Sequence, residues 1–404
     1  MVFGAFGGMW GLASIAGPLL GGVFTDKVSW RWCFYIKCVS RFQLPSSSTN
    51  RYSLPIGAFS VAVIVFVLHM PRDPNDSNKS YVDRIKELDL IGASILIPAI
   101  ICLLLAVQWG GNTYPWNNSR IIGLFVGAGL LLIIFIYSQI VLGEKATIPP
   151  RILKQRTVAA VSAFVFFFGA GIFVLMYYLP LYLQAIKGSS PTESGIQILP
   201  LMLSSVLTSI LAGVYVTVVG HYTPLIILSS ALMTIGAGLI TTFDTDTIFG
   251  KWFGYQIITG LGAGVGFNVP LVAVQTVLPM EDIPIGTVCV MFFQTLGGAL
   301  FIAVAQAVFQ NGFIDGLKIY APELDPKVMV NTGATAIRGV LKETGREALL
   351  KPALMAYVHG LKNSYRVVTA VMGLAFLAAC FFEWKSVKKE GEKRDVSDIP
   401  VAMG

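Results

Sequence analysis

Ten long apolar segments constrain the fold of this chain more than any other feature. A helix needs about 20 mostly apolar residues to cross the roughly 30 Å hydrocarbon core of a bilayer. Of 404 residues, 55% are hydrophobic and only 13% are charged, which leaves too little polar surface for a water-soluble globule. We therefore predict an all-α polytopic membrane protein with about ten transmembrane helices in a lipid bilayer. The predicted spans are 3–24, 54–70, 88–109, 121–142, 157–180, 196–219, 224–243, 252–277, 285–311 and 363–384.

The polar residues argue against several classes of protein. The five cysteines show no CxxC pairing and no histidine at metal-ligand spacing, so neither a metal site nor a disulfide framework is predicted. The sequence contains no HExxH, GxSxG or P-loop motif. We therefore predict no enzyme, no cofactor and no nucleotide-driven pump. The net charge of +7 is interpreted as a topology signal, not as evidence of a nucleic-acid partner.

Loop charge predicts that both termini lie in the cytoplasm. The tail that begins at Lys385 is rich in Lys and Arg, which are favoured in short cytoplasmic segments. The basic loops after spans two and four fall on the same side, whereas loops 181–195 and 244–251 carry one lysine each. The basic loop 25–53 is the exception. A sequon at Asn117 falls in a loop predicted to face outside, where a glycan could be attached.

The segment 312–362 is predicted to form a helical outer loop. Its second part carries Ile337, Leu341 and Leu354 at helical spacing among charged residues. Such a segment either caps the outer face with its apolar side or forms a solvated helical hairpin. Because faces of mixed charge are usually exposed to solvent, we favour the solvated hairpin.

Glycines and one proline mark the first span. Gly17 and Gly21 lie four residues apart, which leaves a flat strip on a helix where another backbone can approach closely. Gly22 follows directly, and Pro18 removes a backbone hydrogen bond and bends the helix. On its own, this pattern indicates helix packing.

The eighth span carries glycines at every second position, which form two interleaved strips of small residues. They are Gly260, Gly262, Gly264 and Gly266. Strips of this kind usually serve close contact between helices in a membrane. Helix packing is therefore the favoured role of these four glycines.

Three amides and one tyrosine are candidates for a substrate cavity. Gln256 and Asn268 flank the glycines of the eighth span, and Gln294 lies in the middle of the ninth. An amide in hydrocarbon either finds a partner or lines a cavity. Tyr178 lies near the outer end of the fifth span, where an interfacial aromatic belt is favoured over stacking against a substrate.

Several short motifs follow one another in an order that resembles one group of transporters. They are GPLLGG at 17–22, WRWCFYI at 30–36, LPIGA at 54–58, LDLIG at 88–92, QWGG at 108–111 and YLPLYLQ at 178–184. Together they resemble the antiporter signature and later segments of fourteen-span drug:proton antiporters in the major facilitator superfamily, as found in fungi. The resemblance covers the whole chain.

This resemblance implies a major facilitator fold and a secondary active transporter. Such a protein exports a small organic molecule, for example a drug, a toxin or a secondary metabolite, against an inward flow of protons. A siderophore transporter of the same superfamily is the main alternative. The resemblance also implies a multi-pass protein of the plasma membrane, or alternatively of the vacuolar membrane. A membrane-embedded enzyme is disfavoured because no catalytic constellation is visible.

In the fourteen-span pattern the antiporter signature belongs to span five, so we expect this chain to be N-terminally truncated. Residues 1–70 then hold the last two helices of the first six-helix half, 71–156 a cytoplasmic loop with two linker helices, 157–384 the second half and 385–404 the cytoplasmic tail. We find no ionisable residue in the middle third of a predicted span, so the coupling residue is expected in the missing helices. A truncated product that does not transport is a further alternative.

Residues 37–53 interrupt the resemblance. This stretch is polar and serine-rich, where the family has a single Asn. We predict a retained short intron, and a loop insertion is the alternative. Mature transcripts that all keep the stretch would contradict the intron.

Overall fold

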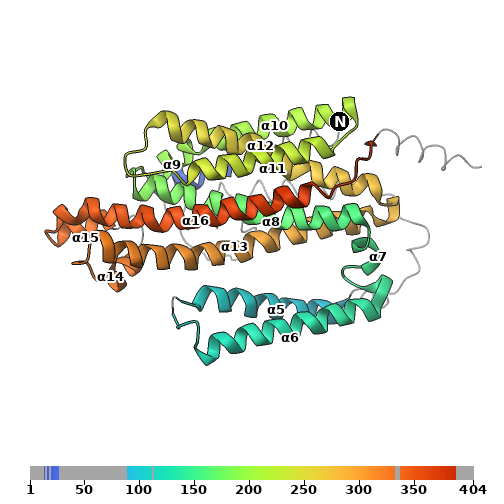
Figure 1. Ribbon diagram of the computed structural model, residues 1–404, viewed down its shortest axis with the longest axis horizontal. Coiled ribbons are helices and arrows are strands. Elements are labelled where there is room, and N and C mark those ends of the chain that lie inside the picture. The colour runs from blue at the N-terminus through green and yellow to red at the C-terminus, as the bar shows by residue number, and fades with distance from the viewer. Residues whose placement is uncertain are drawn as a thin grey trace, which may run out of the picture.

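The chain folds into a bundle of long helices that run alongside one another (Figure 1). This is seen in a computed structural model, which describes residues 13, 16–17, 20–26, 89–111, 113–332 and 337–387. Eight long helices match one for one the spans predicted from residue 88 onward. They are α5 (Leu90–Trp109), α6 (Ser119–Leu142), α8 (Arg156–Ala185), α10 (Leu199–Val219), α11 (Thr223–Ile240), α12 (Phe249–Val277), α13 (Ile283–Tyr320) and α16 (Leu350–Ala379). Seven of the eight, all except α16, are long and apolar enough to cross a membrane, which confirms the all-α polytopic class.

The helix α16 differs from the expected tenth span. It begins at Leu350, carries Lys362 and Arg366 near its middle and ends at Ala379. It packs against α8, α11 and α13 inside the bundle. The predicted span at 54–70, the stretch 37–53 and Pro18 lie outside the described residues.

Short elements lie at the two ends of the long helices (Figure 1). The 3-10 helix η2 (Gly143–Lys145) and α7 (Pro150–Leu153) connect the linker pair α5–α6 to α8, and η3 (Met280–Asp282) precedes α13. At the other end lie α9 (Pro191–Gln197), α14 (Pro326–Thr332), α15 (Ile337–Glu343) and η4 (Glu347–Leu349).

The core of the bundle is centred on α8. This helix contacts α12, α13 and α16, and 72% of its most apolar stretch is buried. Phe164 and Phe168 stack one turn apart with ring centroids 5.6 Å apart, and Phe382 meets Phe164 edge-on at 5.8 Å. The linker pair lies to one side, where α5 contacts α13 (Figure 1).

Glycines let α12 approach three neighbouring helices. A Cβ added to Gly260 or Gly264 would meet the backbone of α10, and one added to Gly262 would lie 2.7 Å from backbone atoms of α11. One added to Gly266 would meet the ring of Phe168 in α8. The two interleaved strips therefore face different helices, and each contact is of the close kind that only a glycine permits.

The segment between α13 and α16 is shorter and more buried than expected. Both helices extend into the predicted outer loop, so only 321–349 separates them. Ile337 and Leu341 are each 1% exposed, and Arg338 donates a hydrogen bond from Nη2 to the carbonyl of Ile186 at 2.7 Å. Our preference for a solvated hairpin is therefore wrong, because the apolar side of α15 packs as a cap near the end of α8.

A partly buried polar network closes the linker hairpin. The carboxylate of Asp89 caps α5 by accepting from the backbone N–H of Gly92 at 2.6 Å, and it also accepts from Gln139 Nε2 at 2.7 Å. The N–H and hydroxyl of Thr147 donate to the same carboxylate at 3.1 and 2.9 Å. Gln139 Oε1 in turn accepts from the N–H of Ile148 at 3.0 Å. The two ends of the hairpin are thus joined through one charged group.

We expect Asp89→Asn to lower the stability of this hairpin by about 1–2 kcal/mol at pH 7, because one amide oxygen replaces two carboxylate oxygens. Partial burial opposes the charge, but hydrogen bonds from Gln139, Gly92 and Thr147 outweigh it and lower the pKa of Asp89 below its usual 3.8. The stabilisation by the ionised carboxylate is complete above the unfolded-state pKa of 3.8. It is lost as the pH falls through the lower pKa of the folded state. Thermal unfolding should therefore separate the two proteins at pH 7 and less so below about pH 4.

Asp315→Asn is the control for this comparison. Asp315 forms an exposed ion pair with Lys318 at 3.0 Å, and such pairs contribute little. An effect of Asp315→Asn as large as that of Asp89→Asn would contradict the structural role of the network.

Candidate functional site

A small aromatic pocket of about 290 Å³ lies between α8, α13, α14 and α16, toward the end of the bundle that carries α14 and α15. Its walls combine aromatic rings with two amides. The lining residues are Tyr177, Tyr178, Leu181, Gln306, Phe309, Gln310, Phe313, Met329, Val330 and Tyr357. Tyr178 and Tyr357 are 1% and 3% exposed whereas Tyr177 is 50% exposed, so the pocket reaches from the core to the surface.

The aromatic rings of the pocket contact one another in sequence. The ring centroid of Tyr178 lies 5.0 Å from that of Tyr177 and 5.7 Å from that of Phe309. Phe309 in turn lies 4.9 Å from Tyr357. Rings that are already fixed by their neighbours offer faces and edges for stacking, so this enclosure suits a flat organic molecule.

Two glutamines supply the polar part of the pocket. Gln306 and Gln310 lie one turn apart on α13, which places them on the same face of the helix. The amide oxygen of Gln310 is buried, and no described residue donates a hydrogen bond to it. A buried acceptor without a donor costs about 1–3 kcal/mol. A ligand with an O–H or N–H group would satisfy this oxygen.

The structure places the predicted tyrosine in this pocket. Tyr178 is buried against Tyr177 and Phe309, so the favoured interpretation as part of an aromatic belt is wrong for this residue. A belt residue would face the lipid headgroups. The hydroxyl of Tyr365 donates to the carbonyl of Tyr178 at 3.1 Å, which ties α16 to α8 beside the pocket.

The three predicted amides lie outside this pocket. Gln256 is fully buried, and neither its amide nitrogen nor its oxygen has a partner among the described residues. Asn268 donates from Nδ2 to the hydroxyl of Ser209 at 2.7 Å and so joins α12 to α10. The buried amide nitrogen of Gln294 has no acceptor within the described part of the chain.

The end of the first predicted span contacts the start of α9. A Cβ added to Gly22 would lie 2.8 Å from the carbonyl oxygen of Pro191 and 2.9 Å from Cα of Thr192. The carboxylate of Asp26 accepts hydrogen bonds from the hydroxyl of Thr192 and, at 2.9 Å, from its N–H. A carboxylate is favoured at this place because the first N–H groups of a helix have no partner within it. By contrast, no atom of the described residues lies within 4 Å of a Cβ added to Gly17 or Gly21.

Sequence reasoning did not name Gln310 or Tyr357 as candidates for the site. The cause is the placement of 312–362 in a loop, which removed Tyr357 from the membrane helices. The spacing of Gln306, Phe309, Gln310 and Phe313 at three and four residues continues one helix face across the predicted boundary at 311. This periodicity was the available signal.

Asn117, the predicted glycosylation site, is exposed in the loop between α5 and α6.

Helices of this length and composition define a polytopic membrane protein, and a pocket of rings and amides lies between them. Residues 11–323 match the family described as "Fungal trichothecene efflux pump (TRI12)". The chain belongs to this family of fungal efflux pumps in the major facilitator superfamily, whose members export small organic molecules.

Curated relatives agree with this assignment. The chain is 48% identical over 385 residues to the "MFS-type efflux pump MFS1" of Trichophyton rubrum, which covers 95% of this chain and 68% of that protein. It is 42% identical over 387 residues to the "Efflux pump aflT" of Aspergillus parasiticus, covering 96% and 71%. It is 40% identical over 397 residues to the "Aspyridones efflux protein" of Neocamarosporium betae, covering 98% and 66%.

Proposed function

We propose that this protein exports small, flat, amphipathic secondary metabolites and binds them in the pocket of Tyr178 and Gln310. The observation that supports this proposal is the buried amide oxygen of Gln310, which has no donor among the described residues and lies inside an aromatic enclosure. Aromatic rings accept many flat molecules, and one buried acceptor selects those with a correctly placed O–H or N–H donor. A volume of about 290 Å³ favours such a molecule over a bulky iron chelate. The name of one relative gives its cargo as aspyridones, and for this chain we propose only the broader class.

The contact between Gly22 and Pro191 is proposed as a gate at one end of the transport path. Transporters of this kind open alternately to either side as two groups of helices rock against each other. The close backbone approach and the hydrogen bonds from Thr192 to Asp26 stabilise the closed arrangement of this contact. Opening would separate the first span from α9.

We propose protons as the coupling ion and the cytoplasm as the location of both termini. The hydroxyl of Thr157 donates to the carboxylate of Glu383 at 2.9 Å, so the basic segment around Arg156 and the start of the tail lie at the same end of the bundle. Two basic segments on one side support a cytoplasmic location for that side. The plasma membrane is the proposed site of action, with the vacuolar membrane as the alternative.

We expect Gln310→Leu to reduce export by about fivefold to a hundredfold, because a substrate donor would lose its acceptor at a cost of about 1–3 kcal/mol. The replacement has nearly the same size and removes only the polar atoms. The measurement is the rate at which cells lose a flat fluorescent compound that carries a hydroxyl group, normalised to the amount of protein in the membrane.

Gln275→Leu is the matched control, since it removes an amide of α12 that does not line the pocket. Export should also stop when a protonophore dissipates the proton gradient. Equal export by Gln310→Leu and the wild-type protein would refute the pocket as the substrate site.

A further inference from the structure

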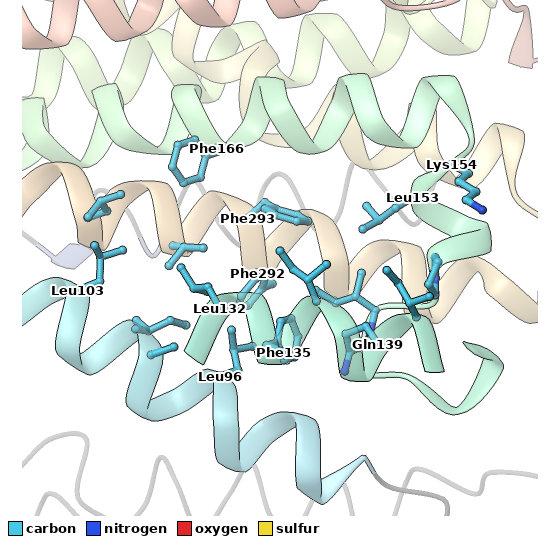
Figure 2. A pocket seen from close by; sticks show the side chains of 18 residues that line it. Leu96, Leu103, Leu132, Phe135, Gln139, Leu153, Lys154, Phe166, Phe292 and Phe293 are labelled. Atoms are coloured by element: carbon cyan, nitrogen blue, oxygen red, sulfur yellow. Dashed lines mark hydrogen bonds between the residues drawn. The ribbon is translucent and has the colours of Figure 1, made fainter. Parts of the chain in front are cut away.

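A second cavity of about 640 Å³ separates the linker pair α5–α6 from the main bundle (Figure 2). Its walls come from the long helices α5, α6, α8 and α13 and from the short helix α7, and they are almost entirely apolar. Leu96 and Leu103 line it from α5, Leu132 from α6, and Phe292 and Phe293 from α13. Each of the four long helices has the length and composition of a membrane span. The cavity therefore lies between membrane-spanning helices.

The shape of this cavity suits a hydrocarbon chain. The lining of α6 runs from Leu132 to Ile140, and eight steps of about 1.5 Å give an apolar wall about 12 Å long. Water would find almost no hydrogen-bond partners there. The linker pair also leaves much of its surface uncovered, since only 17% of the most apolar stretch of α6 is buried, against 72% for α8. Lipid chains are the apolar molecules available at this depth.

The polar groups of the cavity lie at one end. In Figure 2, Lys154 and Gln139 both lie on the side of the cavity away from Leu103. The amide of Gln139 is already engaged, because it donates to Asp89 at 2.7 Å and accepts from Ile148 at 3.0 Å. It has little capacity left to hold a ligand.

The ammonium group of Lys154 is available for an anion. Lys154 is exposed, and within the described residues no carboxylate lies at ion-pair distance from it. The nearby Arg151 is different, because its guanidinium donates to Glu144 at 3.0 Å and to Asp282 at 2.9 Å. These two partners raise the pKa of Arg151, so it stays charged but is committed to protein carboxylates. Lys154 thus places at the mouth of an apolar cavity a positive charge that no described carboxylate pairs with.

An apolar tunnel with a cation at its mouth matches an amphipathic anion. We propose that this cavity binds an acyl chain of an anionic phospholipid, with the lipid phosphate at Lys154. The lipid would fill the space between Leu132 and Phe293 and so join the linker pair to the bundle. Basic pockets between membrane helices are known to attract anionic headgroups, and one lysine near the surface contributes about 1 kcal/mol.

The test measures which lipids stay bound to the protein after it is purified from membranes and incubated with lipid vesicles. Equal mixtures of phosphatidylglycerol and phosphatidylcholine are offered, and bound lipid is measured by native mass spectrometry. We expect wild-type protein to retain phosphatidylglycerol preferentially. Lys154→Gln should reduce this preference by about fivefold. Lys251→Gln, which removes an exposed lysine of α12 that does not line the cavity, should leave it unchanged.

A second variant tests the tail site separately from the headgroup site. Leu132→Trp places a larger side chain in the cavity and should reduce retention of both lipids. Loss of preference in Lys154→Gln together with loss of retention in Leu132→Trp supports the proposal. Equal preference in Lys154→Gln and wild type would overturn it. Binding of the fluorescent export substrate by the wild-type protein that is lost in Leu132→Trp would also overturn it and make the cavity a substrate site.

Discussion

Gly264→Ala is expected to prevent most of the protein from reaching a folded, monodisperse state. The added Cβ would overlap the carbonyl oxygen of Ser205 and lie 2.8 Å from its carbon and 2.9 Å from the backbone nitrogen of Ser209. All three are backbone atoms of α10, which cannot move aside like a flexible side chain. Overpacking of this kind costs about 1–3 kcal/mol and sometimes more. The measurement is size-exclusion chromatography of detergent-solubilised protein, followed by thermal unfolding of the monodisperse fraction.

Gly213→Ala provides the matched control. Gly213 lies on α10, and no atom of the described residues is within 4 Å of a Cβ added there. Alanine is also the better helix former by about 1 kcal/mol. This variant should therefore be at least as stable as wild type. If both variants behave alike, the close approach of α12 to α10 does not determine stability.

Gly22→Ala is expected to reduce export at least tenfold while leaving the amount of folded protein nearly unchanged. Its Cβ would lie 2.8 Å from the carbonyl oxygen of Pro191 and 2.9 Å from Cα of Thr192, so the first span could not close against α9. The rest of the bundle is held by contacts of α8, α12, α13 and α16, which this change does not touch. Export of the fluorescent compound, normalised to folded protein, measures the effect.

A variant of the neighbouring glycine tests whether the loss of export comes from the contact of Gly22 with α9 or from a general need for glycine in this span. No described atom lies within 4 Å of a Cβ added to Gly21, so Gly21→Ala should keep most of the export activity. The sequence analysis instead placed the close helix contact at Gly17 and Gly21, because these two glycines form the strip of small residues. A larger loss for Gly21→Ala than for Gly22→Ala would contradict the proposed gate.

Apolar length was sufficient to predict the long helices but not their ends. The boundary at 311 followed from the polar residues beyond it, yet α13 continues to Tyr320. The reason is packing between two helices: a Cβ added to Gly312 would lie 3.1 Å from Cα of Gly360, and one added to Gly316 would lie 2.9 Å from Cα of Ala356. Such contacts extend helices past the hydrocarbon region, and hydropathy along the chain does not reveal them.

The candidate site was predicted only in part for the same reason. Tyr178 was named from its depth in the membrane, but its burial depends on Phe309 and Tyr357, which come from other helices. Gln310 was not named, because it lies one residue before the predicted end of the ninth span at 311. Only the folded structure shows that its oxygen is buried and has no donor within the described part of the chain. A pocket formed between helices distant in sequence requires knowledge of which helix faces meet.

The most direct test of the central claim is export by cells that express the gene from its full locus, compared with cells that lack it. Both are loaded with the same flat, hydroxyl-bearing fluorescent compound, and its loss from the cells is followed over time. We predict faster loss in the expressing cells, abolished by a protonophore and strongly reduced by Gln310→Leu. Equal rates of loss in both kinds of cell, with the protein present in the membrane, would contradict the assignment of this chain as an exporter of such molecules.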